Sequence, residues 1–282
     1  MRLDSFDMEK YEGKKIPSPG RCIYCGDDQS KLTDEHVIPF ALAGNSAILL
    51  EACCSTCQGI IQKYEQRVLR DRMGIFRARI GAPTRKPKKR PREQKLHFVE
   101  VNEKMEVLRD LGHRVVPIDL APLAFAVWDS APPGILGERS TPEMRAGKPW
   151  TYVHKETAMK LASEVAVETG SNHVAVKVAE VNRLDFLRFV AKTAHAYAVA
   201  ELGHGTFRPT LLDLILGRSD DVAEFIGGDP SPDTITTGPD RMLTITAGRV
   251  TNGPAKGYSA VRMQLYPILG TPAHAAIVGS PL

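Results

Sequence analysis

The chain has 282 residues, of which 43% are hydrophobic and 25% charged, and its formal net charge is +4. This composition is that of a soluble globular protein with enough apolar residues for a sizeable core in one or two domains. No secretory h-region and no window of about 18 apolar residues occurs, so neither a signal peptide nor a membrane span is expected. We therefore expect a cytoplasmic protein, in which five cysteines indicate metal or redox chemistry rather than disulfides.

The polar residues 1–20 end in two prolines and a glycine and predict an arm that leads into a compact module over residues 21–76. Two cysteine pairs, each with two residues between its members, lie in this module: Cys22 and Cys25, then Cys54 and Cys57. Two such turns can direct four thiolates at one ion in the tetrahedral arrangement that Zn²⁺ favours. A structural zinc site is therefore predicted. Redox exchange, which needs only one pair, is the weaker alternative.

Cys53 is the odd cysteine, and we expect it to point away from the pairs and pack as a small apolar residue. Between the pairs, the stretch TDEHVIPFALAG places Asp34, Glu35 and His36 side by side. Four thiolates leave zinc no open position, so chemistry in this module must come from that stretch. A neutral histidine can accept a proton near pH 7 and a carboxylate can bind a hard cation. The alternative is that the two acids are solvated turn residues and that His36 is packed or is a spare zinc ligand.

The residues after the second cysteine pair predict a helix followed by a basic linker. Apolar residues recur at helical spacing from Ile60 to Leu69. Residues 77–95 then carry nine basic residues, one acid and three prolines, which predict a flexible or extended segment. Its cationic run could contact a DNA backbone without sequence preference, through Arg85, Lys86, Lys88, Lys89, Arg90 and Arg92. The alternative is a solvated linker.

Residues 96–282 are predicted to form a larger α+β domain. Residues 184–202 are the clearest helix and end before Gly203, and His195 inside that helix is expected to be packed. Residues 155–168 fit either a helix or a strand. A short helix opened by Pro209 is expected, and strands are expected over 96–101, 104–109, 173–181, 242–250, 258–269 and 273–279.

The runs CIYC, DEHVIPFALAG and CSTCQGIIQKYE, in this order, resemble the HNH endonuclease family in its four-cysteine zinc subgroup, of the stand-alone bacterial type. The resemblance covers about residues 21–70. It implies a ββα-metal fold in which His36 acts as the general base on the attacking water. It also implies a catalytic Mg²⁺ or Mn²⁺ held by Glu35, with Asp34 and Gln58 as further ligands, and DNA as the substrate.

Two positions depart from the family pattern. Leu49 stands where the middle asparagine would fall, and the nearest asparagine is Asn45. Gln58 stands where histidine or asparagine is usual, although its carbonyl oxygen can still bind a cation. These departures keep open the alternative of a catalytically silent, zinc-containing nucleic-acid-binding or adaptor protein.

The sequence thus predicts an α+β protein, with a zinc-stabilised HNH module followed by a larger α+β domain. We expect it to be a metal-dependent endonuclease that hydrolyses phosphodiester bonds in DNA. The layout suggests restriction or anti-phage defence, by analogy alone. Residues 96–282 carry no recognisable motif and are expected to be an accessory or sensor part that binds an activating ligand or a partner protein.

Overall fold

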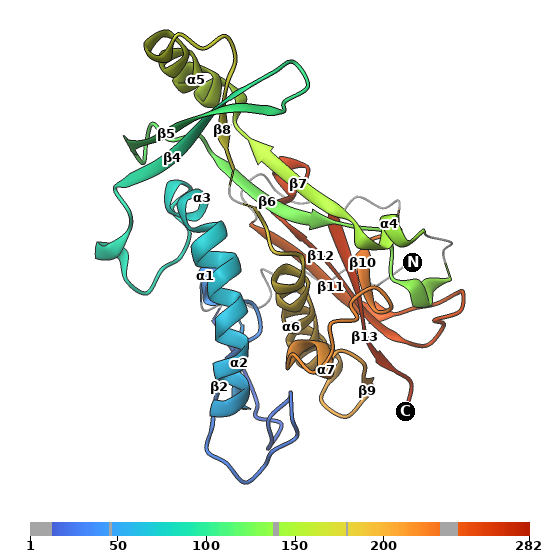
Figure 1. Cartoon of the computed structure of the whole chain (residues 1–282). Coiled ribbons are helices and arrows are strands. Elements are labelled where there is room, and N and C mark those ends of the chain that lie inside the picture. Colours follow the sequence, from blue (N-terminus) through green and yellow to red (C-terminus); the bar gives the residue numbers. More distant parts are fainter. Residues whose placement is uncertain (1–12, 45–46, 138–140, 179, 232–241) are drawn as a thin grey trace.

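The computed structural model describes residues 13–44, 47–137, 141–178, 180–231 and 242–282, so most of the predicted N-terminal arm and Asn45 lie outside the described residues. Helices and sheets are mixed along the chain, which confirms the predicted α+β class. The long helix α6 (Arg183–Leu202) lies between the N-terminal module and the sheet at the C-terminal end (Figure 1). Within the ranges given above, no helix is both long enough and apolar enough to span a membrane.

The N-terminal module is a small sheet with helices that follow its strands. Its strands are β1 (Lys14–Ile16), β2 (Leu32–His36) and β3 (Ala47–Cys54), and its helices are α1 (Phe40–Ala43), α2 (Ser55–Gln66) and α3 (Gly74–Arg79). The middle strand β3 pairs antiparallel with β2 and parallel with β1. α2 starts directly after β3, and a π-helical turn over Arg67–Arg72 continues it. The module therefore has the ββα order that the resemblance implies.

A second sheet is formed by the C-terminal part of the chain. Its order is β10 (Ile226–Gly228), β13 (Ala273–Ser280), β12 (Ser259–Leu265) and β11 (Leu243–Arg249), and β9 (Arg208–Pro209) pairs with the end of β13. β11, β12 and β13 are successive antiparallel neighbours, which confirms the three strands predicted there. Helix α7 (Leu212–Ile215) is shorter than predicted, because Pro209 lies in β9 instead of opening the helix.

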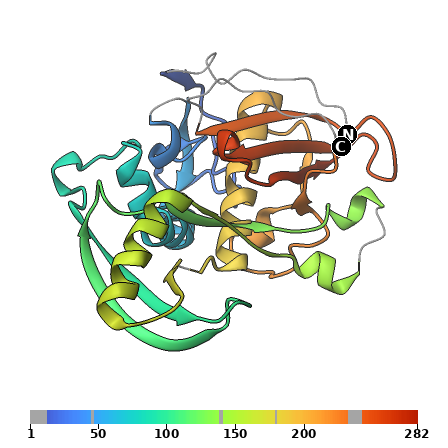
Figure 2. The ribbon, with the colours of Figure 1, turned by 90° about the horizontal axis from the view of Figure 1, so that it is seen from above.

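A third group of elements projects from this body (Figures 1 and 2). β4 (Glu93–Val101) pairs antiparallel with both β5 (Val107–Pro117) and β8 (Val174–Lys177), and α5 (Lys155–Thr169) packs on them through a small core of its own. Residues 155–168, which the pattern left open, are thus helical. The remaining elements are β6 (Ala124–Asp129), β7 (Lys148–Val153), α4 (Pro142–Ala146) and three 3₁₀ turns over Pro87–Lys89, Gly134–Leu136 and Pro267–Leu269.

Helix α6 is the element that joins the N-terminal module to the rest. Nearly every residue from Phe186 to Val199 is buried, as expected for a helix that is apolar on most faces. The Asn182 side chain caps its start by accepting a hydrogen bond from the Asp185 N–H at 2.9 Å. One hydrophobic core runs from the module through α6 to the C-terminal sheet. The core is therefore not divided at residues 77–95.

The basic segment over residues 77–95, predicted to be flexible or extended, contains regular structure at both ends and in the middle. Its first residues belong to α3, a 3₁₀ turn spans Pro87–Lys89, and β4 starts at Glu93. The Arg77 guanidinium donates to three backbone carbonyls, those of Ala41 at 3.0 Å, Leu69 at 2.8 Å and Pro83 at 3.0 Å. A charged side chain with internal acceptors does not need solvent, so this arginine anchors the segment to the module.

Candidate functional site

Four cysteines gather at the end of the module where β3 meets α2. The sulfur atoms of Cys22, Cys25, Cys54 and Cys57 all lie within 4.8 Å of one another, and Cys25 is the exposed member. Sulfurs around a tetrahedral Zn²⁺, at about 2.3 Å from the metal, are about 3.8 Å apart. The Sγ atoms of Cys25 and Cys54 are 3.6 Å apart, so the cluster fits zinc, as predicted.

The turn that holds the first cysteine pair depends on a glycine. Gly26 has φ +78°, a conformation that strains other residues, and its N–H donates to the Cys22 carbonyl at 2.9 Å. The Ile23 N–H donates to the Ala52 carbonyl at 2.9 Å and ties this turn to β3. Cys57 lies in the first turn of α2, so one helix start delivers the second pair.

Cys53 is fully buried and lies outside the cluster of four, as predicted. It does not simply point away, however. Its thiol donates to the Cys54 carbonyl at 3.4 Å, so its one proton has a backbone partner. Cys53 therefore packs beside the cluster, held by a backbone hydrogen bond, and is not one of its four sulfurs.

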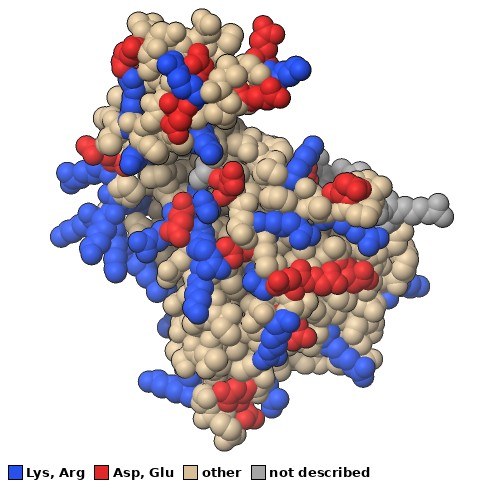
Figure 3. All heavy atoms as spheres, in the orientation of Figure 1, with Lys and Arg blue, Asp and Glu red and all other residues tan. Residues whose placement is uncertain are grey.

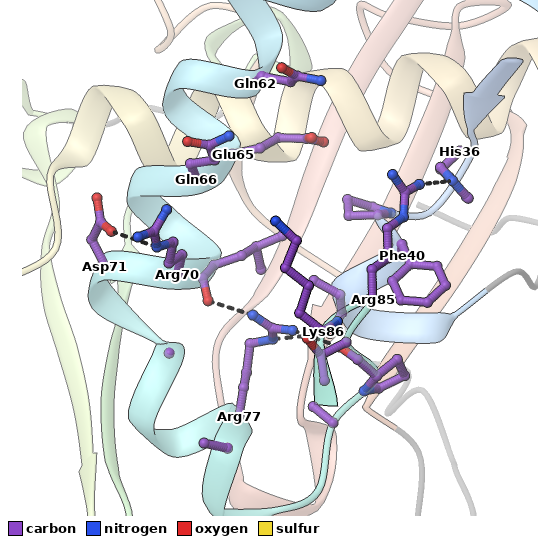
Figure 4. Close-up of a pocket in the computed structure, with 18 of the residues that line it drawn as sticks. His36, Phe40, Gln62, Glu65, Gln66, Arg70, Asp71, Arg77, Arg85 and Lys86 are labelled. Carbon is purple, nitrogen blue, oxygen red and sulfur yellow. Dashed lines mark hydrogen bonds and ion pairs between the residues drawn. The ribbon is translucent and has the colours of Figure 1, made fainter. Parts of the chain in front are cut away.

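A cavity of about 970 Å³ opens beside β2 and α2. It is lined by all four residues of the predicted catalytic site: Asp34, Glu35, His36 and Gln58. Figure 4 shows the side chains of α2 on one side of this cavity and His36 on the other. The structure therefore brings these four residues to one cavity, but their surroundings differ.

His36 ends β2 and is partly exposed toward the cavity. Its Nε2 accepts a hydrogen bond from the Arg85 guanidinium at 2.7 Å (Figure 4), so the neutral ring carries its proton on Nδ1. Arg85 lies 5.2 Å above the centre of the Phe40 ring, which also meets the imidazole edge-on. Burial, together with the positive charges of Arg85 and Lys192, lowers the pKa of His36. A neutral imidazole near pH 7 is the form that a general base requires.

Glu35 is buried and its carboxylate is already paired inside the protein. Its Oε1 lies 2.6 Å from the Lys192 ammonium of α6 and accepts a hydrogen bond from the Tyr24 hydroxyl at 3.1 Å. Asp34 is exposed, and its Oδ1 accepts from the Glu51 N–H at 3.1 Å. Gln58, the third residue predicted to hold a divalent ion, is partly exposed and lies in the first turn of α2.

Lys192 was not predicted to belong to this site. It is 2% exposed and also lies 3.0 Å from Glu65 Oε1 of α2. Burial opposes its charge, but attraction by Glu35 and Glu65 prevails and raises the pKa of Lys192. Burial raises the pKa of Glu65 despite that attraction. The sequence signal that could have pointed to Lys192 is its position: it is a charged residue in the middle of a helix that is apolar on most faces.

The predicted DNA-contact residues divide into two groups. Arg85, Lys86, Lys89 and Arg90 line the cavity, whereas Lys88 and Arg92 are exposed and do not line it. Figure 3 shows lysine and arginine side chains gathered over the loop between α3 and β4. The loop thus places positive charge beside His36, which suits a phosphate-bearing ligand.

His195 is packed, as predicted. It is 1% exposed, and its Nε2 donates to the Ile23 carbonyl at 2.9 Å. Burial lowers the pKa of His195 to about 4, so it is neutral at pH 7. This hydrogen bond connects α6 to the turn that carries the first cysteine pair.

The residues around Glu35 fit an ammonium better than a divalent ion. Mg²⁺ requires oxygen ligands at about 2.0–2.1 Å in octahedral geometry. The Lys192 ammonium already contacts the carboxylates of Glu35 and Glu65 from inside the protein. The divalent ion that the resemblance implies therefore does not fit at Glu35 in this arrangement.

Residues 22–72 match the family model described as HNH endonuclease. The match spans both cysteine pairs, β2, β3 and α2, and it confirms the resemblance for this module. It supports a nuclease-type function in general. No curated protein and no solved structure matches the chain.

Proposed function

We propose that the protein is an HNH-type endonuclease that hydrolyses phosphodiester bonds in DNA at the cavity beside His36. The observation that carries the proposal is a neutral histidine whose accepting nitrogen faces a basic cavity, in the segment that matches the HNH endonuclease model. Phosphodiester hydrolysis needs a base for water and positive charge for the phosphoryl oxygens. His36 and the cationic lining offer both.

In the proposed reaction, His36 Nε2 takes a proton from a water molecule whose oxygen forms a bond to phosphorus. The bond between phosphorus and the leaving sugar oxygen breaks, and that oxygen takes up a proton from solvent. Arg85 has to release Nε2 for this step, and a phosphate anion is a better partner for a guanidinium than a neutral imidazole. We propose that the incoming phosphate draws Arg85 away and is held by it.

The cationic loop is proposed to hold the DNA backbone beside His36. Arg85, Lys86 and Lys89 are exposed at the cavity, and Lys88 and Arg92 extend the charge beyond it. Such contacts act on phosphates without reading bases, so binding should weaken steeply as salt rises. Use in restriction or anti-phage defence, inside the cytoplasm, is proposed on the family resemblance alone.

The resemblance implies Mg²⁺ or Mn²⁺ as the catalytic cofactor, held by Glu35 with Asp34 and Gln58. When bound, such an ion would neutralise charge on the phosphoryl oxygens. Because Lys192 already pairs with Glu35, the steps proposed above are carried by this chain's own residues. Asp34 and Gln58 remain the candidate ligands at the cavity wall.

The proposal is tested by plasmid cleavage with the zinc-loaded full chain, in buffers with Mg²⁺, with Mn²⁺ and with neither. Wild type should nick or cut the plasmid, and His36→Ala should cleave at least about 100-fold more slowly, the scale expected for loss of a general base. A folded wild type that cleaves no faster than His36→Ala in any buffer would contradict the proposal.

A second function, a catalytically silent adaptor that binds nucleic acid, is favoured by the pairing of Glu35 with Lys192 and of His36 with Arg85. It predicts salt-dependent DNA binding without cleavage. That binding should survive His36→Ala and should drop when the basic residues from 85 to 92 are neutralised.

Control of the site by the larger part of the chain is also proposed. Arg85 covers the accepting nitrogen of His36, and Lys192 of α6 donates to the His36 carbonyl. A ligand or partner protein that moves the loop or α6 would therefore change access to His36. Its effect would be seen as cleavage that the full chain performs only in the presence of that partner.

A further inference from the structure

Lys192 is the one lysine of α6, and its ammonium is shared among three oxygens of the N-terminal module. It lies 2.6 Å from Glu35 Oε1 and 3.0 Å from Glu65 Oε1, and it donates to the His36 carbonyl at 3.0 Å. The contact with the His36 carbonyl is a hydrogen bond, whereas those with Glu35 and Glu65 are ion pairs, and Glu65 Oε1 accepts no hydrogen bond from the described residues. Lys192 is 2% exposed, and it lines the cavity together with both carboxylates.

The three oxygens come from two elements and converge on the Lys192 ammonium. Glu35 and the His36 carbonyl belong to β2, and Glu65 belongs to α2. Two carboxylates and a carbonyl are the donor set that a hard cation such as Mg²⁺ or Mn²⁺ prefers. The distances of 2.6 to 3.0 Å, however, are those of N–H···O contacts. The module therefore offers a cation-binding position that a tethered ammonium fills.

Lys192 also holds the base in place. Its bond to the His36 carbonyl joins the end of β2 to α6 across 156 positions of the chain. The Tyr24 hydroxyl donates to the same Glu35 oxygen that Lys192 contacts. Because the backbone of His36 and the carboxylate next to it share one ammonium, the position of His36 depends on a residue outside the segment that matches the HNH model.

We propose that Lys192 is the resident cation of this site. It takes the place at Glu35 and Glu65 that a divalent ion would otherwise occupy, and it positions His36 from α6. Its role as a positioning residue for His36 rests on the proposed function, whereas its occupation of the cation position does not. Two carboxylates with one ammonium carry a formal charge of −1, and without the ammonium the formal charge is −2. Removal of the ammonium should therefore create a divalent-ion site.

The test is Mn²⁺ binding to the zinc-loaded full chain without DNA, measured by calorimetry and by the electron paramagnetic resonance signal of free Mn²⁺. Four variants are compared with wild type: Lys192→Met, which removes the charge; Lys192→Arg, which keeps it; Glu35→Gln; and the double variant Lys192→Met with Glu35→Gln. Lys160→Met, which removes an exposed lysine of α5, is the control for a general change of charge.

Lys192→Met is expected to bind one Mn²⁺ per chain about tenfold or more tightly than wild type, since affinity follows the charge of the ligands. The double variant should lose that site, and Lys192→Arg and Lys160→Met should not gain one. The melting temperature of Lys192→Met should rise with Mn²⁺ while that of wild type does not. A zinc-loaded Lys192→Met that gains no Mn²⁺ site would overturn the proposal.

The comparison of wild type with Glu35→Gln tests whether Lys192 fills the cation position even if Lys192→Met does not fold. If Lys192 fills the position, the two proteins bind Mn²⁺ equally, and a wild-type Mn²⁺ site that Glu35→Gln removes would overturn the proposal. Because no DNA is present, failure of the nuclease proposal leaves this readout unchanged. A structural role alone for Lys192 would change melting but would not create Mn²⁺ binding that depends on Glu35.

Discussion

At the scale of single residues, the environment of His36 decides what the cavity can do. The imidazole accepts a hydrogen bond from Arg85 and lies near the edge of Phe40, and the buried ammonium of Lys192 holds its backbone. Burial and the two nearby cations lower the pKa of His36. Its proton-accepting form is therefore present at neutral pH.

The pH dependence of cleavage should respond to Arg85. His36 must be neutral to act as a base, so activity is present above its pKa and is lost as pH falls through it. Because the charge of Arg85 lowers that pKa, Arg85→Ala should raise it and move the acid limb of kcat/KM to higher pH. We also expect a fall in rate of about 100-fold from loss of a phosphate contact.

Lys88→Ala is the matched control for Arg85→Ala. Lys88 is a cation of the same loop, but it is exposed and does not line the cavity. Lys88→Ala should weaken DNA binding and reduce the salt dependence of binding. The acid limb of kcat/KM should stay at its wild-type position. An acid limb that moves equally in both variants would show that the charge of Arg85 has no specific effect on the pKa of His36 in the DNA-free protein.

At the scale of elements, the zinc cluster fixes the turn of Cys22 and Cys25, the end of β3 and the start of α2 relative to one another. Cys53 and Cys54 are neighbours at the end of β3, yet only Cys54 belongs to the cluster. Cys54→Ser should lose bound zinc and most of the roughly 10 kcal/mol that structural zinc contributes to folding. Cys53→Ser should keep one zinc per chain, with a smaller loss of stability. The zinc content and thermal unfolding of each variant test these expectations. Equal zinc loss in the two variants would contradict the assignment of Cys54, and not Cys53, as a zinc ligand.

Local patterns in the sequence predicted these elements well. The cysteine spacing indicated the zinc cluster, and the apolar run after residue 184 indicated α6. The DEH triplet predicted a catalytic site, and its three residues line one cavity. These signals are local, because a turn, a strand end or a helix face depends on residues close in the sequence. The pairing of Glu35 with Lys192 could not be predicted, since it depends on how α6 packs against α2. The contact between Arg85 and His36 could not be predicted either, because it also depends on tertiary packing and not on residues close in the sequence.

At the scale of the whole molecule, the N-terminal module and α6 form one packed body. They share a hydrophobic core, and the Arg67 guanidinium binds both carboxylate oxygens of Asp185 at 2.6 Å. His195 donates to the zinc turn, and Lys192 pairs with two carboxylates of the module. The module is therefore completed by a helix that lies about a hundred residues further along the chain.

A fragment of residues 1–95 should consequently be impaired even when it is loaded with zinc. Without α6 it exposes apolar core residues and leaves Glu35 and Glu65 without their cation, a loss on the order of 3–5 kcal/mol for a buried pair. We expect a melting temperature lower than that of the full chain by about 10 °C or more, and poorly dispersed amide signals in NMR spectra. A fragment as stable and as active as the full chain would contradict both the shared core and control of the site by the larger part.

The central claim, that His36 is the base of a phosphodiester-cleaving site, is tested most directly by chemical rescue. His36→Gly in the zinc-loaded full chain should cleave DNA about 100- to 10,000-fold more slowly than wild type. Added imidazole should restore part of the rate in proportion to its neutral form, whereas it should leave wild type unchanged. Cleavage by His36→Gly at the wild-type rate, or a folded variant that imidazole does not restore, would contradict the account.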